Sequence, residues 1–126
     1  IKGVITSKDK TMVRVHSFNP IVDLLEDLNV DGQNNLIYKA MKKIDNNNSG
    51  IVIIINDSYK DFISKKLKAD EEIETKDKSN LRQYGVGAQI LSDLGVKNMT
   101  LLSNSNKKAI GLKGFNLSIV DWERLD

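Results

Sequence analysis

The chain has 126 residues, of which 40% are hydrophobic and 29% are charged, and these proportions are ordinary for one globular domain with a sizeable core. It contains no Cys, which excludes disulfides and thiolate metal sites and favours a cytoplasmic protein. The net charge is +2 and the longest apolar run, Ile51 to Ile55, is too short to cross a bilayer, so we expect neither a nucleic-acid interface nor a membrane span.

Two strands and a helix are expected at the beginning of the chain. Residues Lys2 to Thr6 and Thr11 to His16 are predicted to form short strands around a polar turn, with Val13 and Val15 facing the core. Asn19-Pro20 is typical of a helix start, because Asn caps free N–H groups and Pro fits the first helical position. The apolar stripe of this helix consists of Ile21, Leu24, Leu25 and Leu28.

The middle of the chain predicts a helix, a strand and a more polar stretch. The helix ends in the Asn-rich segment Asp45 to Gly50. The β-branched run Ile51 to Ile55 predicts a strand buried on both faces, as in parallel sheets. Asp57 or Ser58 can cap a short helix, and residues 68–80 are predicted to form a mobile loop. The apolar face of the helix that ends at Asp45 to Gly50 comprises Leu36, Ile37, Ala40, Met41 and Ile44.

The last third of the chain is the most regular. It predicts a helix that ends at Gly95, a strand over Met99 to Leu102, a helix over Asn106 to Gly114 and a strand over Leu117 to Trp122. Strands that alternate with helices predict an α/β fold of three layers, in which helices flank a mainly parallel or mixed sheet. The stripe of the helix before Gly95 consists of Tyr84, Ala88, Leu91 and Leu94.

Two polar loops are expected at the carboxyl ends of strands, where such sheets bind ligands. They are Asn56 to Tyr59 and Ser103 to Lys108. In the second loop, hydroxyls, the free N–H groups of a helix start and the ammonium groups of Lys107 and Lys108 form a candidate anion site. The alternative is an ordinary capped helix with solvated lysines, which the local sequence alone favours.

Two segments resemble the GTP cyclohydrolase II family, which opens the guanine ring of GTP in riboflavin synthesis. Arg14-Val15-His16-Ser17 is similar to the family's phosphate-binding signature Arg-Val-His-Ser-Glu, although Phe18 replaces the Glu. The block Leu81 to Val120 has the family's order of helix, strand, helix and strand, and its polar loop is similar to Thr-Asn-Asn-Pro-Lys-Lys. The resemblance implies a GTP cyclohydrolase II-like fold and phosphate or nucleotide contacts by Arg14, His16, Ser17, Ser103 and Lys108.

Arg82 is the residue that the resemblance places in the reaction. The family opens this helix with Asp-x-Arg-x-Tyr-Gly, whose Asp is the general base and whose Arg is the proposed nucleophile toward the GTP phosphate. Here Asn80 stands at the Asp position, and an amide cannot accept a proton at neutral pH. Arg82 is then a vestigial catalytic residue, and the alternative is a helix-start Arg that pairs with a nearby acid.

The cysteines of the family's zinc site are missing. The family places one Cys just after the His-Ser pair and a Cys-x-Cys pair further along. Those segments read Phe18-Asn19-Pro20 and Val30-Asp31-Gly32-Gln33 here. His16, Asn19 and Asp31 are a poor set of zinc ligands, because zinc prefers thiolate and imidazole. We therefore expect no metal and no cofactor, and without zinc no Lewis acid activates the ring-opening water.

The guanine side of the family's site is also altered. After its buried strand the family has a Gln-Glu-Gly-Arg motif and a long helix with a catalytic Tyr. This chain has Asn56 to Lys60, a short helix and a charged loop instead. Tyr59 and Tyr84 are the aromatic candidates, and neither aligns with the catalytic Tyr.

The leading hypothesis is one GTP cyclohydrolase II-like domain, residues 1–126, without cyclohydrolase activity. It is expected to be the C-terminal part of a cytoplasmic riboflavin-synthesis protein, in which it supports a fused 3,4-dihydroxy-2-butanone 4-phosphate synthase domain. The family is typically dimeric, so we expect a homodimer, with Trp122 as a candidate interface or packing residue.

Two alternatives remain open. One is a regulatory module that binds GTP or another phosphorylated small molecule weakly through Arg82 and the five contact residues. The other is an active enzyme with altered chemistry, which would need Asp77 or Glu74 as its base. Those two acids lie in a segment that contains almost no apolar residues to hold them in place, whereas catalysis needs preorganised groups.

Overall fold

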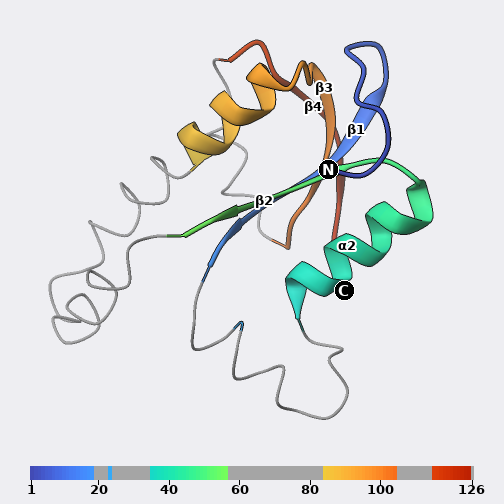
Figure 1. Ribbon diagram of the computed structural model, residues 1–126, viewed down its shortest axis with the longest axis vertical. Coiled ribbons are helices and arrows are strands. Elements are labelled where there is room, and N and C mark those ends of the chain that lie inside the picture. Colours follow the sequence, from blue (N-terminus) through green and yellow to red (C-terminus); the bar gives the residue numbers. More distant parts are fainter. Residues whose placement is uncertain (19–22, 24–34, 57–83, 105–114, 126) are drawn as a thin grey trace, which may run out of the picture.

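The computed structural model describes residues 1–18, 23, 35–56, 84–104 and 115–125. Figure 1 shows a sheet that lies between helices. The labelled elements are β1 (Lys10–Ser17), α2 (Leu36–Asn47), β2 (Ile51–Ile55), β3 (Asn98–Leu102) and β4 (Ser118–Glu123), and residues 84–93 are also helical.

The described strands form one parallel sheet in the order β2-β1-β3-β4. β1 lies inside this sheet, where Val13 pairs with Ile51 of β2 on one side and with Leu101 of β3 on the other. The predicted strands at Thr11 to His16, Met99 to Leu102 and Leu117 to Trp122 are therefore present, with ends that differ by one residue at most. The parallel pairing confirms the predicted α/β class.

Helices cover both faces of the sheet. The helix of residues 84–93 packs on the face that carries Val13 and Val15, and Gly87 allows a close approach, since a Cβ there would lie 3.1 Å from Val15. α2 packs on the opposite face (Figure 1), so the predicted three layers are present. The buried clusters on the two faces are Val13, Val15, Ile51, Ile53, Tyr84, Ala88, Leu91, Val96, Met99 and Leu101, and Ala40, Ile44, Leu102 and Leu125.

Asn residues begin and end α2. The side chain of Asn35 accepts hydrogen bonds from two backbone N–H groups of the first turn, at 2.9 and 3.3 Å, which satisfies donors that a helix start leaves free. Asn48 adopts the left-handed conformation with φ 61° and ends the helix. The Asn-rich segment Asp45 to Gly50 is thus a helix exit, as predicted. Gly95, with φ 84°, ends the helix of residues 84–93, also as predicted.

The prediction of a strand over Lys2 to Thr6 is wrong. Within this segment only Lys2 pairs, in an isolated antiparallel bridge with Gly50. Gly3 has φ 74°, which turns the chain out of an extended course. The hydroxyl of Thr6 then donates to the carboxylate of Asp9 at 2.6 Å, in the turn before β1. The alternating apolar residues of this segment therefore lie in a turn-containing segment and do not form a strand.

The prediction that Ile51 to Ile55 is buried on both faces is also wrong. β2 lies at an edge of the described sheet, and Ile54 is 51% exposed. A run of β-branched residues indicates an extended backbone, but it does not indicate whether the strand is central or at an edge of the sheet. Two residues of the predicted helical stripes, Met41 and Leu94, are likewise exposed, at 56% and 37%.

Several predicted elements lie outside the described residues. They are the helices that start at Asp57 or Ser58 and at Asn106, the loop of residues 68–80, and the helix from Asn19-Pro20 except for Asp23, which is helical. Among the described residues, no helix is long and apolar enough to cross a membrane.

Candidate functional site

Arg14 lies on β1 and is only 3% exposed, which is unusual for a guanidinium. Its Nη1 donates to the backbone carbonyl of Leu102 at 3.1 Å, at the end of β3. Its Nη2 lies 3.1 Å from Nδ1 of His16. Arg14 therefore links β1 to the carboxyl end of β3, directly before Ser103, at the sheet edge where the sequence predicts a ligand site.

The hydrogen bonds of His16 fix its tautomer. A guanidinium group only donates, so Nδ1 of His16 accepts from Arg14 and carries no proton. The other ring nitrogen, Nε2, lies 2.9 Å from Oδ2 of Asp23 and donates to it. His16 and Asp23 are 6% and 8% exposed. The three side chains thus form a buried chain of hydrogen bonds with a neutral imidazole in the middle.

Burial dominates the electrostatics of this cluster. Desolvation lowers the pKa of Arg14 from its ordinary value of 12.5, while the nearby Tyr84 and the carboxylate of Asp23 act in the opposite direction. Desolvation also raises the pKa of Tyr84 above its ordinary value of 10.0, and the charge of Arg14 opposes that rise. The site therefore holds a cation, a neutral phenol and a carboxylate in an environment that is poor in water.

One N–H donor of the Arg14 guanidinium forms no hydrogen bond with the described residues. Its Nε is buried and has no hydrogen-bond partner within the described part of the chain. An unmade hydrogen bond of this kind costs about 1–3 kcal/mol. An oxygen of a phosphate group would satisfy such a donor, and this is the contact that the resemblance implies for Arg14.

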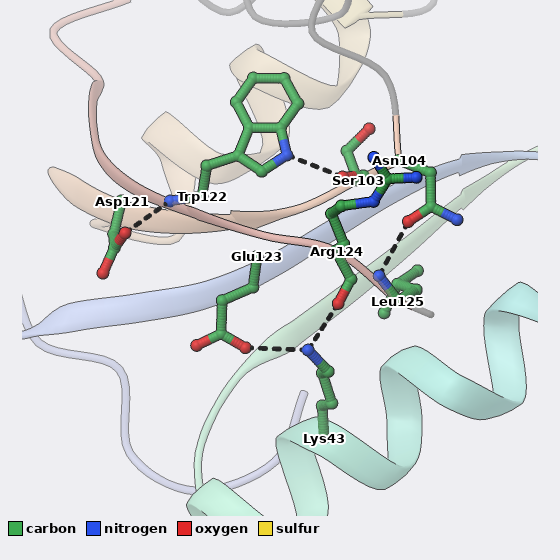
Figure 2. A network of polar contacts seen from close by, with 8 residues as sticks. All are labelled: Lys43, Ser103, Asn104, Asp121, Trp122, Glu123, Arg124 and Leu125. Atoms are coloured by element: carbon green, nitrogen blue, oxygen red, sulfur yellow. Dashed lines mark hydrogen bonds and ion pairs between the residues drawn. The ribbon is translucent and has the colours of Figure 1, made fainter.

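A second polar network joins the ends of β3 and β4 to α2, and Figure 2 shows it from close by. The indole N–H of Trp122 donates to the carbonyl of Ser103 at 2.7 Å, and the N–H of Ser103 donates to the carbonyl of Glu123 at 3.0 Å. Lys43 of α2 donates to the carboxylate of Glu123 at 3.0 Å and to the carbonyl of Arg124 at 2.5 Å. Trp122 therefore packs within the chain and fixes the backbone of Ser103, while its role in a dimer interface stays a prediction.

The predicted contact residues fall into three groups. Arg14 and His16 are hydrogen-bonded to each other, and Arg14 reaches the carbonyl that precedes Ser103, which is itself buried at 2% exposure. Ser17 is exposed at the end of β1, where it pairs with Ile55. Arg82 and Lys108 lie outside the described residues, and the same is true of Asn80 and Tyr59.

Asp23 is the member of the cluster that the sequence analysis did not identify. It lies seven residues after His16 and is the only charged residue in the segment Phe18 to Leu25. A single acid among apolar residues next to a predicted helix start was the available signal, because such a carboxylate needs a buried partner.

The donors of this chain do not fit a thiolate zinc site. The sequence has no Cys, and both ring nitrogens of its single His, His16, are already in hydrogen bonds. In the described ranges no group of three or more His, Asp or Glu side chains could hold a metal ion. The other residues at the family's ligand positions, Asn19 and residues 30–33, lie outside those ranges.

A family model decides what kind of domain this is. The model of GTP cyclohydrolase II matches residues 1–124, which is nearly the whole chain. The chain belongs to the GTP cyclohydrolase II family. The parallel sheet with helices on both faces is therefore the GTP cyclohydrolase II-like α/β fold that the resemblance implied.

Curated relatives of this family member carry names from riboflavin synthesis. The riboflavin biosynthesis protein RibBA of Chlorobium phaeovibrioides is 35% identical over 96% of this chain and 32% of its own length. RibBA of Parabacteroides distasonis is 31% identical over 96% of the chain and 33% of its own length. The 3,4-dihydroxy-2-butanone 4-phosphate synthase of Photobacterium phosphoreum is 34% identical over 96% and 33%. The chain thus spans about a third of the length of these relatives.

Proposed function

We propose that this member of the GTP cyclohydrolase II family is a domain of a riboflavin-synthesis protein that has no cyclohydrolase activity of its own. In this proposal the domain supports a fused 3,4-dihydroxy-2-butanone 4-phosphate synthase domain in a cytoplasmic homodimer. It acts as a folded scaffold and holds no zinc.

The hydrogen bonding of His16 carries the proposal. In a chain without Cys, this imidazole would be the best zinc ligand left, yet Nδ1 accepts from Arg14 and Nε2 donates to Asp23. Recruiting His16 to a metal would break one of these buried hydrogen bonds. Without zinc, the site lacks the Lewis acid that would activate water for ring opening.

A second and independent loss supports the same conclusion. Asn80 stands where the family has its general base, and an amide does not accept a proton. Restoring a metal alone would therefore leave proton transfer unassisted. Two separate losses fit a scaffold better than an enzyme with altered chemistry, which would have to recruit Asp77 or Glu74.

The names of the relatives support the fused synthase. Two are called riboflavin biosynthesis protein RibBA and a third is called 3,4-dihydroxy-2-butanone 4-phosphate synthase. Each is about three times as long as the stretch that aligns with this chain. A length of this kind leaves room for a synthase domain in the same polypeptide.

The test is to incubate the full-length protein with GTP, Mg²⁺ and Zn²⁺ and to measure the release of formate. We expect none, while RibBA of Chlorobium phaeovibrioides serves as the comparison protein in the same assay. The full-length protein is also assayed for the formation of 3,4-dihydroxy-2-butanone 4-phosphate, which we expect. Formate release at enzyme-like rates would contradict the proposal that the domain has no cyclohydrolase activity. Absence of the synthase product would contradict the proposal of a fused synthase domain.

A second candidate function is a phosphate-binding regulatory module. The observation that favours it is the buried Nε of Arg14, which has no hydrogen-bond partner among the described residues and lies on a side chain that reaches the end of β3. Calorimetric titration with GTP, GMP and ribulose 5-phosphate separates this candidate from a pure scaffold. Heat that saturates with one of these ligands would support the module, and no heat at millimolar ligand would argue against it.

A further inference from the structure

The last carbonyl groups of β3 are held by side chains from both neighbouring strands. The carbonyl of Leu102 accepts a hydrogen bond from Nη1 of Arg14, which belongs to β1, at 3.1 Å. The next carbonyl, that of Ser103, accepts from the indole N–H of Trp122, which belongs to β4, at 2.7 Å. Two consecutive carbonyls at the carboxyl end of β3 are therefore bonded to two different strands.

The two side chains reach the end of β3 from opposite faces of the sheet. Trp122 packs against the apolar cluster that contains Val13. Arg14 follows Val13 in β1, and because side chains alternate along a strand it leaves β1 on the other face, where α2 lies. Figure 2 shows the indole of Trp122 bonded to Ser103. The end of β3 is thus fixed from both sides of the sheet.

The peptide group between Leu102 and Ser103 connects the contacts made by β4 with the contact made by Arg14. Its carbonyl oxygen accepts from Arg14, and its N–H donates to the carbonyl of Glu123 in β4 at 3.0 Å. Because a peptide group is planar, a rotation that moves its N–H also moves its carbonyl oxygen. The hydrogen bonds between β4 and Ser103 therefore also set the direction of the carbonyl that holds the guanidinium.

We propose that Trp122 is a positioning residue for a phosphate contact of Arg14. Trp122 does not touch the phosphate group. It holds Ser103, and through the carbonyl of Leu102 it orients the guanidinium so that the buried Nε donates to a phosphate oxygen. This inference rests on the second candidate function, the phosphate-binding module. The Nε of Arg14 suits that contact, because no described residue accepts a hydrogen bond from it.

A small rotation of the guanidinium is enough to weaken such a contact. A hydrogen bond prefers an angle above about 150° at the hydrogen atom and weakens steeply below about 120°. Arg14 has little freedom to readjust, since Nη1 and Nη2 are already bonded to Leu102 and His16. Loss of the indole N–H should therefore lower the affinity for phosphate even where the domain stays folded.

The test is an NMR titration of the full-length protein with GMP and with inorganic phosphate. The Nε–H signal of Arg14 is assigned from its absence in Arg14→Lys. We expect this signal to shift on addition of either ligand, and the indole N–H signal of Trp122 to shift over the same range of concentration. Tighter binding of GMP than of inorganic phosphate would identify a nucleotide as the source of the phosphate group.

Trp122→Phe keeps an aromatic ring and removes only the indole N–H. We expect this variant to bind both ligands about tenfold more weakly, which corresponds to the loss of one hydrogen bond. The matched control is Lys43→Met, which removes hydrogen bonds from α2 to Glu123 and Arg124 at the same end of β4 and leaves the indole in place. It should bind both ligands like the parent protein.

Four results would overturn the proposal. If folded Trp122→Phe binds like the parent protein, Trp122 only stabilises the fold, and the phosphate-binding module stands without it. An equal loss of affinity in Lys43→Met means that any loosening of β4 weakens the site. An indole signal that stays fixed in the parent protein while that of Arg14 shifts means that the two contacts are not coupled, and this result needs no folded variant of Trp122. An Arg14 signal that neither ligand shifts overturns this inference together with the second candidate function, while the formate assay tests the absence of cyclohydrolase activity separately.

Discussion

Arg14 shows how a charged residue is tolerated inside this domain. Its guanidinium donates to the carbonyl of Leu102 and to His16, and the carboxylate of Asp23 supplies negative charge at the far end of the chain of hydrogen bonds. Removing one member of a buried set costs more than the set itself contributes, because the remaining polar groups stay desolvated. The cluster is therefore expected to respond strongly to the loss of its acid.

We predict that Asp23→Ala lowers the free energy of unfolding by about 1–3 kcal/mol, because Nε2 of His16 loses its acceptor in a buried site. Asp23→Asn keeps an oxygen that can accept from Nε2 and should cost less. Thermal unfolding of the variants provides the measurement. Asp93→Ala is the control, since Asp93 is an exposed acid that, among the described residues, accepts only a 3.3 Å hydrogen bond from Gln89. An equal decrease in the free energy of unfolding for Asp23→Ala and Asp93→Ala would contradict a stabilising role of the Asp23–His16 hydrogen bond.

Tyr84 makes the stability of the domain depend on pH in the alkaline range. Burial raises its pKa in the folded state above the value of 10.0 that applies in the unfolded chain. Above pH 10 the unfolded chain therefore releases a proton that the folded chain retains. The contribution of Tyr84 to stability is complete below pH 10 and is lost as the pH rises toward the folded pKa.

We predict that Tyr84→Phe makes the loss of stability between pH 9 and 11 less steep. Urea unfolding at a series of pH values measures this slope. Tyr38→Phe removes an exposed hydroxyl and is the matched control, which should keep the slope of the parent protein. A slope that is the same in the parent protein and in Tyr84→Phe would show that Tyr84 does not titrate differently in the folded state.

At the scale of secondary-structure elements, the helix of residues 84–93 ends in a Schellman motif. The N–H of Val96 donates to the carbonyl of Leu91 at 3.1 Å, and the N–H of Gly95 donates to that of Ser92 at 3.0 Å. Both bonds satisfy carbonyls that the helix end leaves free. The motif requires a left-handed residue, which Gly95 supplies with φ 84°.

We predict that Gly95→Ala destabilises the domain by about 1 kcal/mol, through backbone strain alone, because a Cβ there meets nothing within 4 Å. Gly85→Ala is the matched control. Gly85 lies inside the same helix, also has open space around its Cβ position and has no positive φ, so the substitution should stabilise by about 0.5–1 kcal/mol. Unfolding midpoints that move in the same direction for both variants would contradict this assignment.

The sequence could predict the elements of this fold but not all of their surroundings. The helix exit at Asn48 and the end at Gly95 follow from local chemistry, and both are observed. The exposure of Ile54 depends on the strand order, which no local pattern reports. The acceptor for His16, Asp23, belongs to a different element, so its role emerges only when the chain is folded.

At the scale of the whole molecule, the question is whether the domain depends on a metal ion. In proteins with a zinc site, the free energy of metal binding adds to the stability of the folded state, and chelation removes it. This chain has no Cys, and its single imidazole is bonded on both nitrogens. We therefore expect no contribution of a bound metal ion to its stability.

We predict that EDTA leaves the melting temperature of the full-length protein unchanged and that added Zn²⁺ does not raise it. Elemental analysis of the purified protein should find no bound zinc in a stoichiometric amount. RibBA of Chlorobium phaeovibrioides is the comparison protein in both measurements. A melting temperature that falls on chelation and returns with Zn²⁺ would show that this chain builds a metal site from other donors. The domain would then have to be reconsidered as an enzyme. A bound zinc would restore the Lewis acid that we propose this chain has lost.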